Sequence, residues 1–134
     1  MSRGGRLALA LALTAALLGG CMSARRPEPK AELPDSDSEV GIASYYASKF
    51  EGRLTANGER YRGRELTAAH RTLPFGTRIR VTHVASGRAV ECRVNDRGPH
   101  TKGRIVDLSH RAAESLGILR EGVARVSLVV LESP

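Results

Sequence analysis

The chain has 134 residues, about the length of one domain, with 41% hydrophobic and 26% charged residues. This composition excludes a fully disordered or collagen-like chain, and two cysteines are too few for a small disulfide-held protein. The formal net charge of +7 favours a polyanionic neighbour, such as an envelope polymer, lipid headgroups or nucleic acid.

Residues 1–20 have the features of a lipoprotein signal peptide. Two arginines precede an apolar run at 7–18, which is shorter than the roughly 20 residues of a membrane span. Small residues then precede Cys21, a pattern that resembles the lipobox of bacterial lipoproteins. The resemblance implies cleavage before Cys21 and a membrane anchor of acyl chains on this cysteine. An ordinary signal peptide with an incidental cysteine is the alternative.

The residue after the cysteine bears on the location of the protein. Inner-membrane lipoproteins of Gram-negative bacteria often have Asp there, whereas this chain has Met22. The resemblance therefore favours the outer membrane, facing the periplasm, if the source is Gram-negative. Residues 22–40, with three prolines and no apolar periodicity, are expected to be a disordered tether behind the lipidated cysteine.

Residues 41–132 predict a small domain of mainly β structure. Apolar and polar residues alternate in 77–84 and in 88–94, which indicates two strands that each bury one face. Ala85–Gly87 between them predicts a short hairpin loop. Further strands are expected at 42–46, 66–69, 105–108 and 123–131. Many short strands with one or two short helices predict a small barrel.

Two local features complete the expected domain. Ser109 can cap a short helix and Gly117 can end it. Cys92 lies on the apolar side of its predicted strand, so we expect a buried free thiol.

Three loop clusters contain the residues that could take part in catalysis. They are Thr55–Glu59, the run that ends in His70, and the stretch that delivers Asp96 into a Gly-Pro turn. Two carboxylates that converge on a groove can cleave a glycosidic bond, one as the proton donor and the other charged. Structural interpretations stay open: a hydrogen bond within its own turn for Asp96, a structural hydrogen bond on its strand for Asp107, solvation for Glu59, and a satisfied hydrogen bond for His70.

Other chemistries find little support in the sequence. The four histidines have no ligand spacing and no cysteine pair is present, so we expect no metal site and no cofactor. Nucleic acid is not expected as a partner, because the arginines are scattered and the aromatic residues are few.

Taken together, the clusters resemble the rare lipoprotein A (RlpA) family. Matching stretches occur in family order, among them GIASYY at 41–46, TANGE at 55–59, LTAAHRTLP at 66–74, RVNDRGP at 93–99 and GRIVDLS at 103–109. The resemblance implies a six-stranded double-psi β-barrel, as in expansins. It also implies endolytic lytic transglycosylation of peptide-stripped peptidoglycan, which cleaves the MurNAc-GlcNAc bond and forms 1,6-anhydro-MurNAc.

The same resemblance suggests roles for individual residues. Asp96 would act first as general acid and then as base, Glu59 would stabilise charge or share the proton, and His70 would orient a carboxylate or bind sugar. The expected substrate-binding residues are Tyr46, Asn57, Asn95, Arg97 and Asp107. The expected partners are glycan strands and the membrane, and the protein is expected to be a monomer.

Two of the departures from the family pattern motivate an alternative function. The family usually has Trp-Tyr-Gly where this chain has Tyr45-Tyr46-Ala47, and a common His is Glu51 here. These changes keep open a non-catalytic, expansin-like lipoprotein that binds peptidoglycan. The C-terminal peptidoglycan-binding module of many members is not found before Pro134, so septal targeting by that route is not expected.

Overall fold

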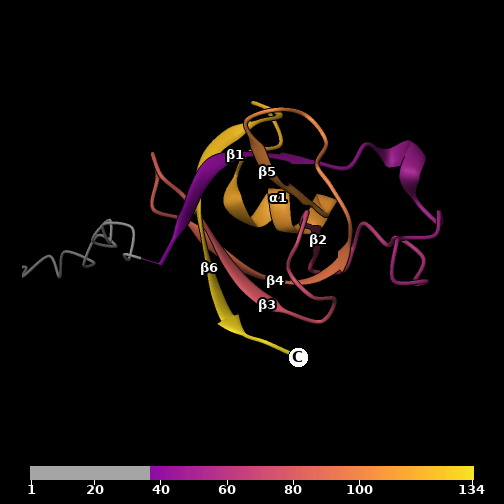
Figure 1. Cartoon of the computed structure of the whole chain (residues 1–134). Coiled ribbons are helices and arrows are strands. Elements are labelled where there is room, and N and C mark those ends of the chain that lie inside the picture. The colour runs from indigo at the N-terminus through magenta and orange to yellow at the C-terminus, as the bar shows by residue number, and fades with distance from the viewer. Residues whose placement is uncertain (1–36) are drawn as a thin grey trace, which may run out of the picture.

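Six strands close into a barrel in the order β1-β5-β2-β4-β3-β6 (Figure 1). The computed structural model describes residues 37–134; the expected signal peptide, Cys21 and most of the expected tether lie outside them. In chain order the elements are β1 (Glu39–Tyr45), the 3-10 helix η1 (Ser48–Phe50), β2 (Thr67–Ala69), β3 (Arg78–His83), β4 (Ala89–Asp96), β5 (Arg104–Leu108), α1 (His110–Leu116) and β6 (Ala124–Glu132).

The pairing of the strands mixes both directions. β1 pairs with β5 and β2 with β4 in parallel, whereas β1–β6, β2–β5, β3–β4 and β3–β6 are antiparallel. The predicted mainly β barrel of six strands with one or two short helices is therefore confirmed. Alternation determines the inner face, because Ile79 and Val81 of β3 are fully buried while Arg78 and Arg80 are exposed.

Two strands extend further than the sequence pattern indicated. β4 continues beyond the predicted end at Val94, because Asp96 pairs with Ala69 of β2. β1 begins at Glu39, whose backbone pairs with Leu128 of β6. The first residues of β1 therefore belong to the barrel and not to the tether in which the sequence reading placed them. The other strand ends agree to within about one residue, which is the usual uncertainty of assignment.

Helix α1 has the ends that the sequence predicted. The Ser109 hydroxyl accepts a hydrogen bond from the Ala112 N–H at 3.2 Å, and Gly117 ends the helix at φ 73°. The helix buries its apolar face, including Leu116, against the barrel core. Cys92 is a buried free thiol, as predicted, and burial raises its pKa to about 12.

The segment between β1 and β2, residues 46–66, projects to one side of the barrel (Figure 1). It contains η1 and a short antiparallel bridge between Leu54 and Arg60. This segment places TANGE beside the end of β4. Among residues 37–134, no helix is long and apolar enough to cross a membrane.

Candidate functional site

Asp96, the last residue of β4, lies at the centre of a cluster of hydrogen bonds. Its Oδ2 accepts a bond of 2.6 Å from the Tyr46 hydroxyl. Its Oδ1 accepts bonds of 2.8 Å from the backbone N–H groups of Ala56 and Arg97. Two donors from the segment 46–66 and one from the next residue in the chain therefore fix this half-buried carboxylate at the end of its strand.

A second carboxylate belongs to the same part of the barrel. Ala69 of β2 pairs with Asp96 on one side and with Asp107 of β5 on the other. Two strand spacings separate the two acids by about 10 Å between their Cα atoms. Asp107 is in turn opposite Ser44 of β1, whose hydroxyl donates to it. Half-buried acids thus flank a fully buried alanine, which leaves no large side chain between them.

Tyr46 connects the two acids to an aromatic cluster. Burial raises the pKa of its hydroxyl, and so do the hydrogen bond to Asp96 and the nearby charge of Asp107. The phenol therefore stays protonated and continues to donate to Asp96. Its ring lies 4.6 Å from the Tyr61 ring and 5.8 Å from the Phe50 ring, between centroids.

Glu59 is brought to this region by the TANGE loop, which contacts β4. Its two oxygens accept bonds of 2.7 and 2.9 Å from the Arg93 guanidinium, and Asn95 donates a third at 3.3 Å. The bidentate Arg93 pair is the main cause that lowers the pKa of Glu59 to about 2. Glu59 is therefore ionised at neutral pH. An ionised carboxylate paired with Arg93 gives no support to the expected sharing of a proton, and the expected stabilisation of charge by Glu59 stays a prediction.

The Glu59–Arg93 pair predicts a pH-dependent contribution to stability. Because folding lowers the pKa of Glu59 from its ordinary value of 4.5 to about 2, its contribution is fully present well above pH 4.5 and is lost as the pH falls towards 2. Both side chains are 39% exposed, so Glu59→Gln is expected to lower the free energy of unfolding by about 1 kcal/mol or less at pH 7. Urea unfolding at pH 7, 4 and 3 measures this difference.

The difference between wild type and variant should shrink between pH 5 and pH 3. Glu132→Gln is the matched control, because its 3.6 Å pair with Arg78 is more exposed, at 68% for the glutamate. A Glu59→Gln effect that stays constant down to pH 3 would contradict the role of this ion pair.

His70 is 5% exposed and both of its ring nitrogens are occupied. Nδ1 accepts hydrogen bonds from the backbone N–H groups of Thr72 and Leu73, at 3.2 and 3.1 Å. The proton therefore lies on Nε2, which donates to Glu39 at 3.0 Å. The backbone N–H of His70 donates to the backbone carbonyl of Asp96 at 3.2 Å, so the ends of β2 and β4 are joined here.

The remaining expected contact residues form part of the framework of the site. The Arg97 guanidinium lies 4.0 Å from the Phe75 ring centroid and donates to the carbonyls of His70 and Leu73. Asn95 is 2% exposed, and Asn57 accepts within its own turn. Their contact with substrate stays a prediction.

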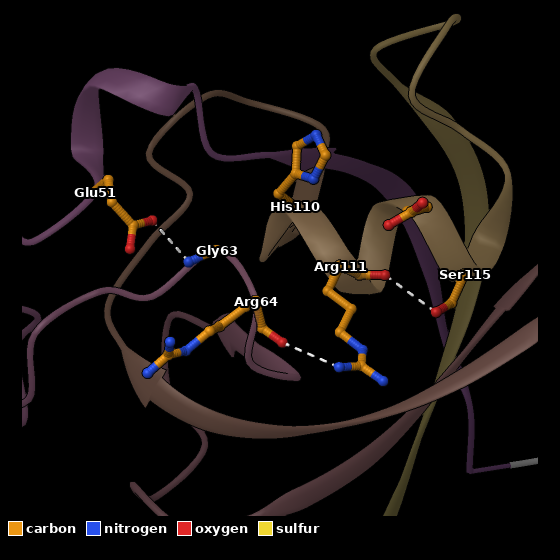
Figure 2. A pocket seen from close by; sticks show the side chains of 7 residues that line it. Glu51, Gly63, Arg64, His110, Arg111 and Ser115 are labelled. Atoms are coloured by element: carbon orange, nitrogen blue, oxygen red, sulfur yellow. Dashed lines mark hydrogen bonds between the residues drawn. The ribbon is translucent and has the colours of Figure 1, made fainter.

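A depression of about 610 Å³ lies beside α1 (Figure 2). Its walls come from α1 and from the loop that contains Glu51, Gly63 and Arg64. The Tyr61 hydroxyl accepts from the His110 N–H at 3.1 Å, which joins the cluster to this depression. Tyr45 belongs to the packing, because its hydroxyl donates to the Leu119 carbonyl. Within residues 37–134, no three acidic, His or Cys side chains form a group that could hold a metal ion.

Sequence reasoning alone missed two participants in this site. Arg93 occupies an outward position of an alternating strand, where an arginine is usually solvated. Glu39 was placed in the tether. The signal that could have found Glu39 is its position two residues before Gly41, at the start of the first matching stretch.

Comparison with known proteins identifies the family. A family model described as "Lytic transglycolase" matches residues 38–128, which is nearly the whole barrel. The chain belongs to the RlpA family of double-psi β-barrel proteins. A probable endolytic peptidoglycan transglycosylase RlpA of Synechocystis sp. is 55% identical over 92 residues, 69% of this chain and 29% of that protein. The endolytic peptidoglycan transglycosylase RlpA of Vibrio cholerae is 46% identical over 98 residues, 73% of this chain and 37% of that protein.

Solved structures agree with the double-psi barrel. The Streptomyces papain inhibitor is 22% identical, with a TM-score of 0.59 over 75% of this chain and 100% of its own. An expansin of Clavibacter michiganensis is 21% identical, with a TM-score of 0.56 over 72% of this chain and 52% of its own. These similarities concern the fold of the RlpA domain. The chain spans well under half the length of both RlpA relatives above, so their activity is a proposal for this protein.

Proposed function

We propose that this chain is an endolytic peptidoglycan lytic transglycosylase. It would cleave the MurNAc-GlcNAc bond of peptide-stripped glycan strands and leave a 1,6-anhydro-MurNAc end. Family membership supports the reaction class, and the RlpA relatives that bear this name match across the barrel. The observation that carries the proposal is Asp96, a carboxyl group held at a strand end by three donors, with a protonated phenol on its Oδ2.

A single carboxyl group can serve both halves of this reaction. As general acid, Asp96 would donate a proton from Oδ2, whose partner, the Tyr46 hydroxyl, can both donate and accept. It gives the proton to the glycosidic oxygen of the leaving GlcNAc while the C1–O bond of MurNAc breaks. The MurNAc 6-hydroxyl then bonds to C1 and returns its proton to Asp96. Atoms and protons balance without water, and the group ends as it began.

The neighbouring groups would prepare this chemistry rather than carry the proton. Asp107 and the ionised Glu59 would supply negative charge that stabilises the oxocarbenium-like centre. Tyr46 would orient the Oδ2 of Asp96. His70 would act as a positioning residue, because its ring nitrogens are engaged inside the protein and its N–H binds the Asp96 backbone.

Mass spectrometry of the products tests the proposed function. The purified full chain is incubated with amidase-stripped glycan strands. Products that end in 1,6-anhydro-MurNAc support the proposal, and reducing ends would replace it by a hydrolase on the same barrel. Binding without any product would favour the expansin-like alternative, in which the barrel holds glycan and does not cut it.

We propose that the protein works in the bacterial cell envelope, attached by lipid on Cys21. The lipobox-like sequence supports this location. Cys21→Ala is expected to abolish palmitate labelling and to move most of the protein from the membrane to the soluble fraction. Cys92→Ala is the control, because it removes the other of the two cysteines. A protein that stays unlabelled and soluble with Cys21 intact would contradict the anchor.

A further inference from the structure

The depression beside α1 contains two arginines that have no acidic partner. Arg64 and Arg111 line it, and neither forms an ion pair with any residue in the range 37–134. Within residues 37–134 only Arg78, Arg80 and Arg93 are paired with glutamates, so Arg64 and Arg111 are set apart by their place in the depression and not by the lack of a partner. The depression thus offers exposed guanidinium groups whose N–H donors are largely free.

The loop that holds Arg64 is fixed against α1, the helix that holds Arg111. The Gly63 N–H donates to Glu51 at 2.8 Å, and the Gly63 carbonyl accepts from the Arg111 N–H at 2.9 Å. The Arg111 side chain makes one long bond of 3.5 Å to the Arg64 carbonyl. A β-carbon on Gly63 would come within 3.2 to 3.4 Å of Glu51, His110 and Tyr61, so little space remains between loop and helix. The arginines therefore start from a rigid backbone, which reduces the entropy lost on binding.

The depression lies close to the proposed reaction centre. Tyr46 donates to Asp96 and contacts the Tyr61 ring, and the Tyr61 hydroxyl accepts from His110 at the wall of the depression. Tyr61 is itself buried, at 3% exposed, so it links the two places through the protein interior. A glycan that is cleaved at Asp96 and continues over this side of the molecule would place a neighbouring sugar at the arginines.

The chemistry of the peptidoglycan glycan strand supplies a ligand for an arginine. In intact peptidoglycan the lactyl group of muramic acid is amide-bonded to the peptide and is uncharged. Removal of the peptide leaves a free lactyl carboxylate on each muramic acid. A guanidinium binds a carboxylate with two parallel charge-assisted hydrogen bonds, which a neutral amide cannot match.

We propose that Arg64 and Arg111 form a subsite for the free lactyl carboxylate of a muramic acid next to the cleaved bond. The inference rests on the proposed function and deepens it, because it assigns the preference for peptide-stripped strands to two residues. Glu51 and Glu114 also line the depression and would repel a carboxylate. Glu51 is held by Gly63. In Figure 2 the Arg111 side chain extends away from Glu51 and His110, whereas the Arg64 side chain extends to the side on which Glu51 lies. The anionic group would bind at the Arg111 guanidinium, on the side away from Glu51.

Glycan strands with and without charged lactyl carboxylates test the subsite. Amidase-stripped strands are compared with the same strands after their carboxylates are converted to methylamides by carbodiimide and methylamine. Calorimetric titration uses the full chain with Asp96→Asn, so that the strands are not consumed. Amidation is expected to weaken binding about ten-fold, the effect of one lost charge-assisted pair. In the Arg64→Gln/Arg111→Gln background, the two strands should bind equally.

Arg62→Gln is the matched control, since this exposed arginine of the same loop does not line the depression. The Arg62→Gln variant should prefer the glycan strands with free carboxylates as strongly as the parent chain does. Equal binding of both strands by the parent, or a preference that survives the double substitution, would overturn the subsite.

Cleavage by the wild type separates the two proposals. If the wild type forms 1,6-anhydro ends equally well on both strands, the subsite is wrong and the proposed function stands. If it neither cleaves nor binds either strand, the proposed function fails and the subsite fails with it.

Discussion

Asp96→Asn is expected to lower the rate of 1,6-anhydro product formation by about 10²–10⁴-fold, because the variant loses the group that would donate and recover the proton. The fold should persist. The Oδ1 of an asparagine can still accept from Ala56 and Arg97, and its amide can donate to the Tyr46 hydroxyl oxygen. The free energy of unfolding should therefore change by about 1 kcal/mol or less. Initial rates by mass spectrometry and urea unfolding measure the two effects.

Asp107→Asn is the matched comparison for this prediction. It removes the same charge two strands away, and Ser44 can still donate to the new amide oxygen. We expect a loss of about ten-fold or less, since this side chain would act through its field and not by proton transfer. The opposite order, in which Asp107→Asn abolishes cleavage and Asp96→Asn retains most of it, would assign the proton to Asp107.

The parts of the fold that were predictable carry their signals locally. The β3–β4 hairpin follows from alternation on both sides of a short loop, and Gly87 in that loop has φ 74°. The helix is determined by Ser109 and Gly117 at its ends. In each case the interacting residues lie close together in the sequence, so a pattern in one window is sufficient.

The parts that were missed depend on contacts between distant segments. Glu39 is 31 residues from His70, and the strand that orders it pairs with the last strand of the barrel. Period-two alternation predicted that Asp107 faces away from its apolar neighbours. Its hydrogen-bond partner Ser44 is 63 residues away, and their contact depends on the parallel register of β1 and β5. Arg93 meets Glu59 across 34 residues. No local pattern specifies such partners, because closure of the barrel brings them together.

Two backbone contacts determine what a substitution at His70 should do. The Nδ1 atom of His70 orders the turn that ends at Leu73, and the carbonyls of that turn accept from Arg97, the neighbour of Asp96. His70→Ala removes this acceptor and leaves space beside Glu39. We expect it to lower the free energy of unfolding by about 2–3 kcal/mol. The resulting shift of Asp96 should lower kcat by up to about 100-fold.

His70→Asn distinguishes a positioning role from proton transfer. The Oδ1 of an asparagine occupies nearly the position of Nδ1 and can accept from the same Thr72 and Leu73 N–H groups, as in an Asx turn. If His70 positions Asp96, His70→Asn should recover most of the stability and of kcat, and the pH profile of cleavage should match that of the wild type. If His70 carries a proton, His70→Asn should be as inactive as His70→Ala even where it is folded. Restored stability without restored kcat would therefore contradict the positioning role, because the asparagine supplies the acceptor but cannot exchange a proton as an imidazole does.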